Sequence, residues 1–439
     1  MKSLAYSETY MDVAVERLEG MYQQRLASQL SQTDALYYKL LTDHYRDMRD
    51  ARKMGKKLVF HTALLPTEIL YAMDVVPGAV VGICDSLNSF NNTWEQALAS
   101  AKAFGIASEI CANIRMEVGT VLNGVVPRPD AMVMSNISCD NVAMVGDLLV
   151  RLWDCPSYYV DLPYRYDEAS VAYLTRTLHG LVVFLEGLTG RKLDWDRLLQ
   201  AMEYARHMME LQRELDELRK VSPALLRDLV LFEDNISFHF MGASEAVTFF
   251  CALRDEAKAR VAQGAGHVRE EKYRLLTVFQ PPPWGWKLFD WMEREHGVTV
   301  VYEPIFAHWG SWDWDPANPL EALARKTFMR RLFRAEHGPI ELLEEDIVSR
   351  VKEYNVDGVI NFCNVSCRAK STAHRLIKDK IREGAGVPYF AIEHDGRGPG
   401  ERKMGANLGR LSDVADFDSE TDLRDKVESF LEMIAAGRL

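Results

Sequence analysis

Long hydrophobic runs and an excess of positive charge are both missing from this 439-residue sequence. No apolar run approaches the roughly 20 residues of a membrane-spanning helix, and the amino terminus lacks the apolar region of a secretory signal. A formal net charge of -12 argues against a nucleic-acid surface, because such surfaces are built from clustered Lys and Arg. Neither a membrane nor a nucleic acid is therefore expected as a partner, and the cytoplasm is the expected location.

Four common catalytic motifs are also missing. The glycine-rich phosphate loop has no match, and its nearest approach, GLTGRK at 187–192, has the wrong spacing. No G-x-G-x-x-G motif follows a strand-like run, and neither a G-x-S-x-G turn nor an H-E-x-x-H helix occurs. The chain is therefore not expected to hydrolyse ATP itself, to bind a dinucleotide, or to act as a serine or zinc hydrolase.

Composition and length indicate a globular protein of two or three domains, with 48% hydrophobic and 26% charged residues. Helical periodicity predicts a helical arm at 1–55 and a helical middle section at 166–268. Elsewhere β-branched runs alternate with helical segments, which predicts α/β domains at 56–165 and 269–439, the second with a C-terminal helix. The expected fold is two Rossmann-like (flavodoxin-like) parallel-sheet domains, with a binding site in the cleft between them.

Strands and one helix of these domains have definite expected positions. A helix is expected from about 140 to 152, on helical periodicity. Apolar runs rich in β-branched residues predict strands at 130–136, 157–163, 273–279, 298–306, 357–363 and 387–393.

Seven cysteines are scattered through the chain, an odd number that argues for thiols or metal ligands and against a disulfide framework. Cys111 starts a helical stretch, while Cys139 and Cys367 each follow a predicted strand and precede a helix. A helix N-terminus favours a thiolate, and ligands bind at the carboxyl edge of an α/β sheet. Three such thiolates from two domains are able to hold one iron–sulfur cluster that leaves one iron open.

Other interpretations of the cysteines stay open on pattern alone. A cysteine outside a disulfide is commonly a small buried hydrophobic residue, and Cys155 and Cys251 are assigned to that class. Cys363, Cys367 and His374 offer three zinc ligands, without a compact second pair of cysteines. The residues themselves do not decide among burial, zinc and an iron–sulfur cluster.

Eight segments add a wider resemblance. They are PTEILYAMDVVP (66–77), SEICANIRMEVG (108–119), RPDAMVMSNISCD (128–140), YYVDLPY (158–164), EEKYRLLTVFQPPPW (270–284), DPANPLEALA (315–324), VDGVINFCNVSCR (356–368) and VPYFAIEHD (387–395). In this order they resemble the family of ATP-dependent benzoyl-CoA reductases and (R)-2-hydroxyacyl-CoA dehydratases. The resemblance implies two Rossmann-like domains that hold a 4Fe-4S cluster through three cysteines, which by motif position are Cys111, Cys139 and Cys367.

The resemblance also implies a complex. The cluster subunit pairs with a related second subunit in a heterodimer, and a separate ATPase delivers single electrons at low potential. The substrate is an acyl-CoA thioester. One branch of the family reduces an aromatic ring, and the other forms an enoyl-CoA through a ketyl radical. An ATPase on another chain agrees with the missing phosphate loop.

Glu68, in PTEI, matches a family position near the cluster, which implies an acid–base or ligand-side carboxylate. The structural alternative is that Glu68 caps the first turn of a helix. Arg115 and Arg368 are candidates to balance cluster charge or to bind CoA phosphates, or else form surface ion pairs. The aromatic segments 281–291 and 308–316 either wall a dry site or serve ordinary packing.

The segment 246–266, and Asp74 at a position where dehydratases often have glycine, resemble the larger cluster subunit of the benzoyl-CoA reductases. The expected function is therefore reductive dearomatisation of an aromatic acyl-CoA, and a 2-hydroxyacyl-CoA dehydratase subunit is the alternative. A double-cubane cluster reductase is a further alternative, if Cys84 and Cys363 join the cluster. The last alternative is a non-catalytic partner subunit.

Overall fold

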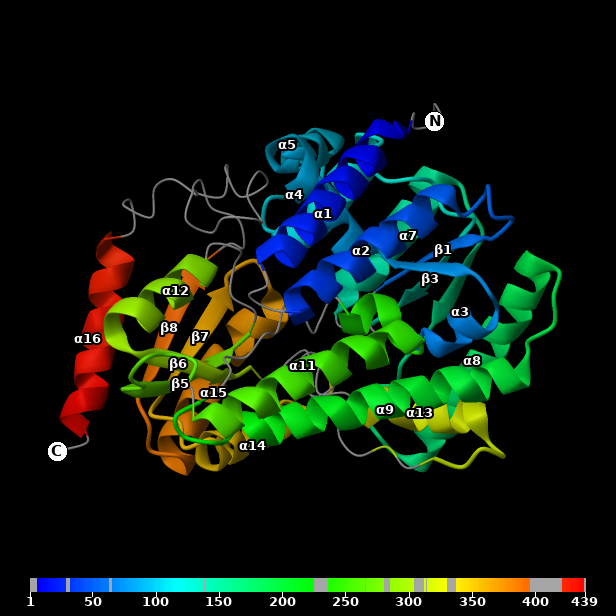
Figure 1. Ribbon diagram of the computed structural model, residues 1–439. Coiled ribbons are helices and arrows are strands. Elements are labelled where there is room, and N and C mark those ends of the chain that lie inside the picture. Colours follow the sequence, from blue (N-terminus) through cyan, green and yellow to red (C-terminus); the bar gives the residue numbers. More distant parts are fainter. Residues whose placement is uncertain are drawn as a thin grey trace.

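Two four-stranded parallel sheets, each flanked by helices, form the framework of the molecule (Figure 1). This arrangement confirms the predicted α/β fold class. The computed structural model describes residues 6–28, 32–62, 65–137, 139–224, 236–264, 266–279, 285–303, 312, 314–329, 337–394 and 421–437.

The first sheet has the strand order β2-β1-β3-β4. Its strands are β1 (Leu58–His61), β2 (Val76–Ala79), β3 (Ala131–Ser135) and β4 (Ser157–Val160). β1 pairs in parallel with β2 and β3, and β3 pairs in parallel with β4. The first three strands are buried along their whole length, as parallel strands covered on both faces are, whereas the edge strand β4 is partly exposed.

The second sheet repeats this topology with the order β6-β5-β7-β8. Its strands are β5 (Tyr273–Val278), β6 (Val298–Tyr302), β7 (Gly358–Asn364) and β8 (Tyr389–His394). In both sheets the second and third strands in chain order flank the first, so the order reverses beside β1 and beside β5. A strand overlaps each of the six ranges predicted from the sequence.

Helices make up most of the remaining described residues. The N-terminal pair is α1 (Thr9–Ser28) and α2 (Gln32–Asp50). The first sheet is accompanied by α3 (Glu68–Ala72), α4 (Val80–Asn91), α5 (Trp94–Phe104), α6 (Ala112–Leu122) and α7 (Asp140–Trp153), and α7 agrees with the predicted helix. Three long helices follow: α8 (Glu168–Thr189), α9 (Trp195–Arg219) and α11 (Ser244–Gln263). The second sheet is accompanied by α12 (Gly285–His296), α13 (Pro319–Met329), α14 (Ile340–Glu353), α15 (Arg368–Gly384) and α16 (Thr421–Gly437).

A large core connects most of these elements, and a smaller core lies on one face of the second sheet. Leu276 of β5 belongs to the large core, which it shares with residues of α14 and α15. Its neighbour Leu275 points to the opposite face and belongs to the small core with residues of α12 and α16. The paired helices α9 and α11 extend from the first sheet toward the second in Figure 1.

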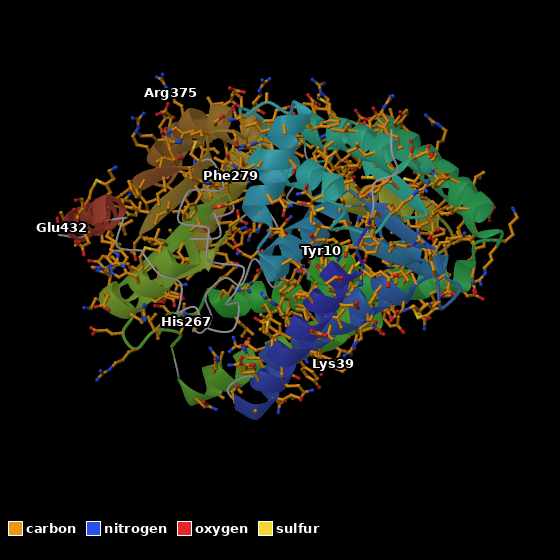
Figure 2. All side chains as sticks on the ribbon, turned by 90° about the horizontal axis from the view of Figure 1, so that it is seen from above. Tyr10, Lys39, His267, Phe279, Arg375 and Glu432 are labelled. Carbon is orange, nitrogen blue, oxygen red and sulfur yellow. The ribbon has the colours of Figure 1, made fainter. Side chains whose placement is uncertain are left out.

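Charged side chains cover the outside of the molecule. In Figure 2, Lys39 of α2, Arg375 of α15 and Glu432 of α16 lie on the outer surface, and all three are exposed. Among the described helices, none combines the length and the apolar character needed to cross a membrane.

Candidate functional site

Cys139 and Cys367 occupy equivalent positions in the two sheets. Cys139 comes after β3 and is the N-cap of α7, and Cys367 comes after β7 and is the N-cap of α15. β3 and β7 each lie beside the strand where the order reverses, which is where ligands bind in sheets of this kind. The structure therefore confirms that both thiols lie at a carboxyl edge and at a helix start.

The segments that join β3 to α7 and β7 to α15, here called the two turns, share the sequence pattern Asn-x-Ser-Cys. The pattern is NISC at 136–139 and NVSC at 364–367. Ser138 of the first pattern lies outside the described residues. A four-residue repeat is too short to be noticed by itself, and the sequence predictions missed it. The identical strand order shows that the two copies are equivalent, and aligning the chain with itself at the two cysteines is the signal that reveals them.

Cys111 is the N-cap of α6, as predicted, but it has no such counterpart in the second half of the chain. The helix that precedes β7, α14, is capped by Pro339. Arg115 Nε donates a hydrogen bond to the carbonyl oxygen of Ile110 at 2.8 Å, so this side chain braces the turn that carries Cys111. Arg368, by contrast, is exposed at the first position of α15.

All three helices begin without a side-chain hydrogen bond from the capping cysteine. Asp167 caps α8 by accepting from Ser170 N at 2.8 Å, and Asp194 caps α9 by accepting from Arg197 N at 3.1 Å. Further helices, among them α4, α5, α11 and α14, begin without a side-chain cap, as the cysteine-capped helices do. Ser, Thr, Asp and Asn are the favoured caps, and a thiol is not. Helix starts of this kind direct backbone N–H groups and a positive dipole end toward an anion.

The structure does not support a zinc site. In the described ranges, no three His, Cys, Asp or Glu side chains are grouped closely enough to hold a single metal ion. This holds for Cys363, Cys367 and His374, and also for Cys111, Cys139 and Cys367. His374 Nδ1 lies 2.9 Å from the hydroxyl of Tyr389 instead. A four-iron cluster binds each thiolate at a different iron, so its ligands lie farther apart than the ligands of one ion.

Cys84 in α4 and Cys363 in β7 are both buried. Burial raises the pKa of each thiol, and the nearby carboxylates of Glu117 at Cys84 and Glu393 at Cys363 raise it further. The prediction that Cys363 is a buried strand residue is confirmed.

Hydroxyl groups fix the carboxyl edge of the first sheet. Thr62 follows β1, and its Oγ1 accepts a hydrogen bond from Ser135 N at 2.9 Å at the end of β3. The two hydroxyl oxygens are 3.2 Å apart, and Ser135 Oγ accepts from Ile137 N at 3.2 Å. These buried contacts hold the ends of β1 and β3 together and begin the turn that leads to Cys139.

Glu68 begins α3 and is fully buried. Its Oε1 forms an ion pair with Nζ of Lys326, a buried residue of α13 that comes 258 positions later. Its Oε2 has no hydrogen-bond partner among the described residues. The capping alternative fails, since Glu68 is paired across the fold with a cation and keeps one oxygen available.

The aromatic segments predicted as site walls are described only in part, because 281–284, 308–311 and 313 lie outside the described residues. Trp312 is buried and stacks on Trp314, with ring centres 5.8 Å apart. Lys326 Nζ lies 5.2 Å from the centre of the Trp312 ring. Trp312 thus packs beside the Glu68–Lys326 pair.

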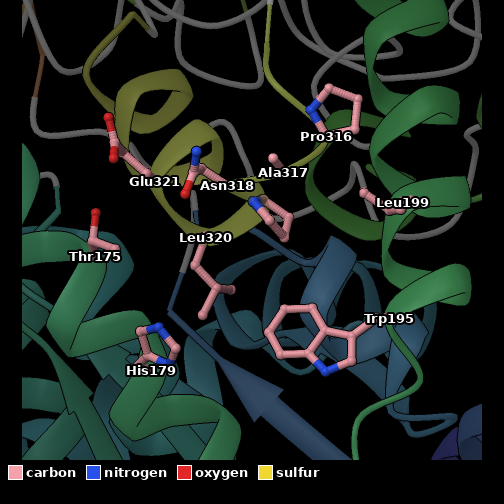
Figure 3. A pocket seen from close by; sticks show the side chains of 10 residues that line it. Thr175, His179, Trp195, Leu199, Pro316, Ala317, Asn318, Leu320 and Glu321 are labelled. Carbon is pink, nitrogen blue, oxygen red and sulfur yellow. The ribbon is translucent and has the colours of Figure 1, made fainter.

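A hollow of about 430 Å³ lies where α8, α9 and the start of α13 meet (Figure 3). His179 of α8, Trp195 of α9 and Leu320 of α13 line it. Its lining includes none of the cysteines and not Glu68. This hollow is therefore separate from the thiols at the sheet edges.

Comparison with known proteins places the whole arrangement in one family. Residues 62–434 match the family described as 2-hydroxyglutaryl-CoA dehydratase, D-component. A benzoyl-CoA reductase subunit from Thauera aromatica is 24% identical, over 91% of this chain and 94% of that protein. The (R)-phenyllactyl-CoA dehydratase alpha subunit of Clostridium sporogenes is 22% identical, over 80% of this chain and 86% of that protein. The (R)-2-hydroxyglutaryl-CoA dehydratase alpha subunit of Acidaminococcus fermentans is 23% identical, over 62% and 57%. The chain therefore belongs to the 2-hydroxyglutaryl-CoA dehydratase D-component family.

Proposed function

We propose that this chain is the cluster-binding subunit of an enzyme complex that acts on an acyl-CoA thioester. Cys111, Cys139 and Cys367 are the proposed ligands of a 4Fe-4S cluster. The observation that carries the proposal is the pair of equivalent turns, each of which presents a cysteine at a helix N-terminus on the carboxyl edge of its sheet. The named relatives are subunits of enzymes for CoA compounds, which supports the substrate class.

The three residues fit such a cluster by the chemistry of their donors. Thiolates are the usual protein ligands of iron–sulfur clusters, and backbone N–H groups near the sulfurs stabilise their negative charge. When bound, the cluster supplies single electrons at low potential and one iron position for a substrate oxygen. Arg115 holds the Cys111 turn through the carbonyl of Ile110.

Glu68 is the proposed acid–base group. Lys326 fixes one carboxylate oxygen, which leaves Oε2 as the atom that holds or releases a proton. Both side chains are buried, so water is kept from the carboxylate. Lys326 is a positioning residue in this scheme, since it acts through Glu68.

Within this class, reductive dearomatisation of an aromatic acyl-CoA is the favoured reaction. The reductase relative from Thauera aromatica aligns with 91% of the chain at 24% identity, which supports this choice. Asp74 also supports the reductase branch. It adopts φ 55°, a conformation that favours glycine, and is held there by ion pairs with Lys56 at 2.9 Å and Arg191 at 3.1 Å.

Dehydration of a 2-hydroxyacyl-CoA is the second candidate, because the matched family and three relatives carry dehydratase names. In either case the proposed complex includes a related second subunit, and a separate ATPase supplies the electrons. The sequence contains no phosphate loop, which supports the placement of ATP hydrolysis on another chain.

An anaerobic assay with the partner subunit, the activating ATPase and a strong reductant tests this proposal. Benzoyl-CoA and an (R)-2-hydroxyacyl-CoA are supplied separately, and products and consumed electrons are counted. We expect turnover of benzoyl-CoA with electrons consumed in proportion to product. Turnover of the hydroxyacyl-CoA alone, with electrons recycled, would instead establish the dehydratase. No turnover of either thioester by a complex that contains its cluster would overturn the proposed function.

A further inference from the structure

We propose that Asn136 and Asn364, the first residues of the two Asn-x-Ser-Cys turns, are positioning residues that hold Cys139 and Cys367 through different sets of hydrogen bonds. The inference rests on the proposed function in one respect, because cluster binding is the reason why the two cysteines would need to be held in place. The hydrogen bonds themselves are independent of it. One repeated residue thus does the same task in two ways.

The Asn136 side chain joins the residues that follow β3 to the residues that follow β4. Its Nδ2 donates to Asp161 Oδ1 at 3.0 Å and to Leu162 O at 3.0 Å, and its Oδ1 accepts from Leu162 N at 2.8 Å. Asp161 is held in turn by the hydroxyl of Tyr173 on α8, which donates to Oδ2 at 2.9 Å. Asn136 therefore uses both the donor and the acceptor of its amide to fix the residues after β3 against those after β4.

The hydrogen bonds of Asn136 also involve a contact with the second half of the chain. His337 Nε2 lies 2.9 Å from the same Leu162 carbonyl that receives the Asn136 amide. His337 precedes α14, the helix that leads to β7. A change at Asn136 therefore disturbs a point where the first sheet's edge contacts the second half.

Asn364 closes its own turn instead. Its Oδ1 accepts from Ser366 N at 3.0 Å and from Ser366 Oγ at 2.8 Å. Its backbone oxygen accepts from Cys367 N at 3.0 Å, and the link to β8 is made by the backbone, with Val365 N donating to His394 O at 2.8 Å. Among the described residues, the side-chain hydrogen bonds of Asn364 thus use the oxygen alone.

This difference makes the substitution of Asn by Asp informative, because Asp has the same shape but no amide donor. At position 136 a carboxylate oxygen would face the Asp161 carboxylate and the Leu162 carbonyl, so two hydrogen bonds become repulsions. At position 364 the carboxylate keeps the acceptor that binds Ser366. The same change in the same motif should open the first turn and leave the second closed.

The test uses the full chain with Asn136→Asp, Asn364→Asp and Asn364→Ala. Alkylation rates of Cys139, Cys367 and the control Cys251 are measured by peptide mass spectrometry on the iron-free protein. Iron retained against a chelator is measured after anaerobic reconstitution. We expect Asn136→Asp to raise the Cys139 rate about tenfold and to lower iron retention about tenfold. Asn364→Asp should stay within about twofold of wild type, and Asn364→Ala should raise the Cys367 rate.

A donor swap guards against simple misfolding. Asn136→Asp combined with Asp161→Asn places an amide donor opposite the new carboxylate, and it should bring the Cys139 rate at least halfway back to wild type. If Asn136→Asp unfolds the chain, Cys251 reacts as well, and the swap is then the deciding variant. Failure of the swap, or equal effects of Asp at both positions, overturns the inference.

A separate arm distinguishes this inference from the proposed function. Cys139→Ala should abolish iron retention if Cys139 is a ligand. Wild-type retention in Cys139→Ala would refute the ligand assignment, while the alkylation rates of the iron-free protein would still decide how the two turns are held.

Discussion

The two α/β units share a strand order and a cysteine-bearing turn, yet they are held together differently. The first unit lies within the large core. One face of the second sheet instead packs in a small separate core with α12 and α16. Strand topology therefore places the cysteines, whereas the packing around each unit sets how much change that unit tolerates.

The buried link between the units should give the largest effect. Lys326→Met removes the cation from the buried Glu68 carboxylate, and we expect a loss of about 3–5 kcal/mol in the free energy of unfolding. Arg325, the preceding residue of α13, pairs with the exposed Glu168, so Arg325→Ala should change stability little. Adding Glu68→Gln to Lys326→Met should recover much of the loss. Urea unfolding checks all three variants, and similar losses for Lys326→Met and Arg325→Ala would contradict the role of burial.

Substitution of a packed glycine should also cost different amounts of stability in the two units, with a smaller effect than the loss of the buried ion pair. A Cβ atom at Gly119, in the helix that begins after Cys111, would overlap the backbone carbonyl of Ala97 in α5. Gly119→Ala should therefore cost about 3 kcal/mol, since backbone cannot move aside cheaply. A Cβ at Gly358 would meet only the side-chain ends of Ile434 at 2.7 Å and Phe430 at 2.8 Å, so Gly358→Ala should cost about 1 kcal/mol. Chemical denaturation measures both, and a reversed order would show that the second unit is the less tolerant one.

The two units should also differ in how their stability depends on pH, and this is the smallest of the expected effects. Burial raises the pKa of Glu117 from its ordinary 4.5 to about 8. The stability that protonated Glu117 contributes is therefore complete below pH 4.5 and is lost as the pH rises through 8. Over this range the free energy of unfolding falls by on the order of 1 kcal/mol per pH unit. Glu117→Gln imitates the protonated acid and should flatten this loss between about pH 5 and pH 8.

A matched acid in the second unit provides the control for that experiment. The Glu271 side chain is only 6% exposed and accepts a hydrogen bond from Arg274 at 2.9 Å, so Glu271→Gln should lower stability without removing the loss toward pH 8. Urea midpoints at several pH values report both variants. An unchanged slope in Glu117→Gln would show that this carboxyl group is ionised in the folded chain.

The sequence predicted those features that depend on neighbours along the chain. The apolar runs placed the strands, and the positions of Cys111, Cys139 and Cys367 at helix starts followed from the elements around them. Glu68 was found by its motif, but its partner Lys326 lies 258 residues away, and only the packing of α13 brings the two together. Asn136 was missed for the same reason, because its partners after β4 become neighbours only when the sheet forms.

Mössbauer spectroscopy on the chain reconstituted anaerobically with ⁵⁷Fe tests the central claim most directly. The account predicts one 4Fe-4S cluster per chain in the wild type and its loss in Cys139→Ala and Cys367→Ala. The buried Cys155 is the control, and Cys155→Ala should leave the spectrum unchanged. Absence of a cluster in the wild type, or the wild-type spectrum in Cys139→Ala, would contradict the proposal that the two equivalent turns share one cluster.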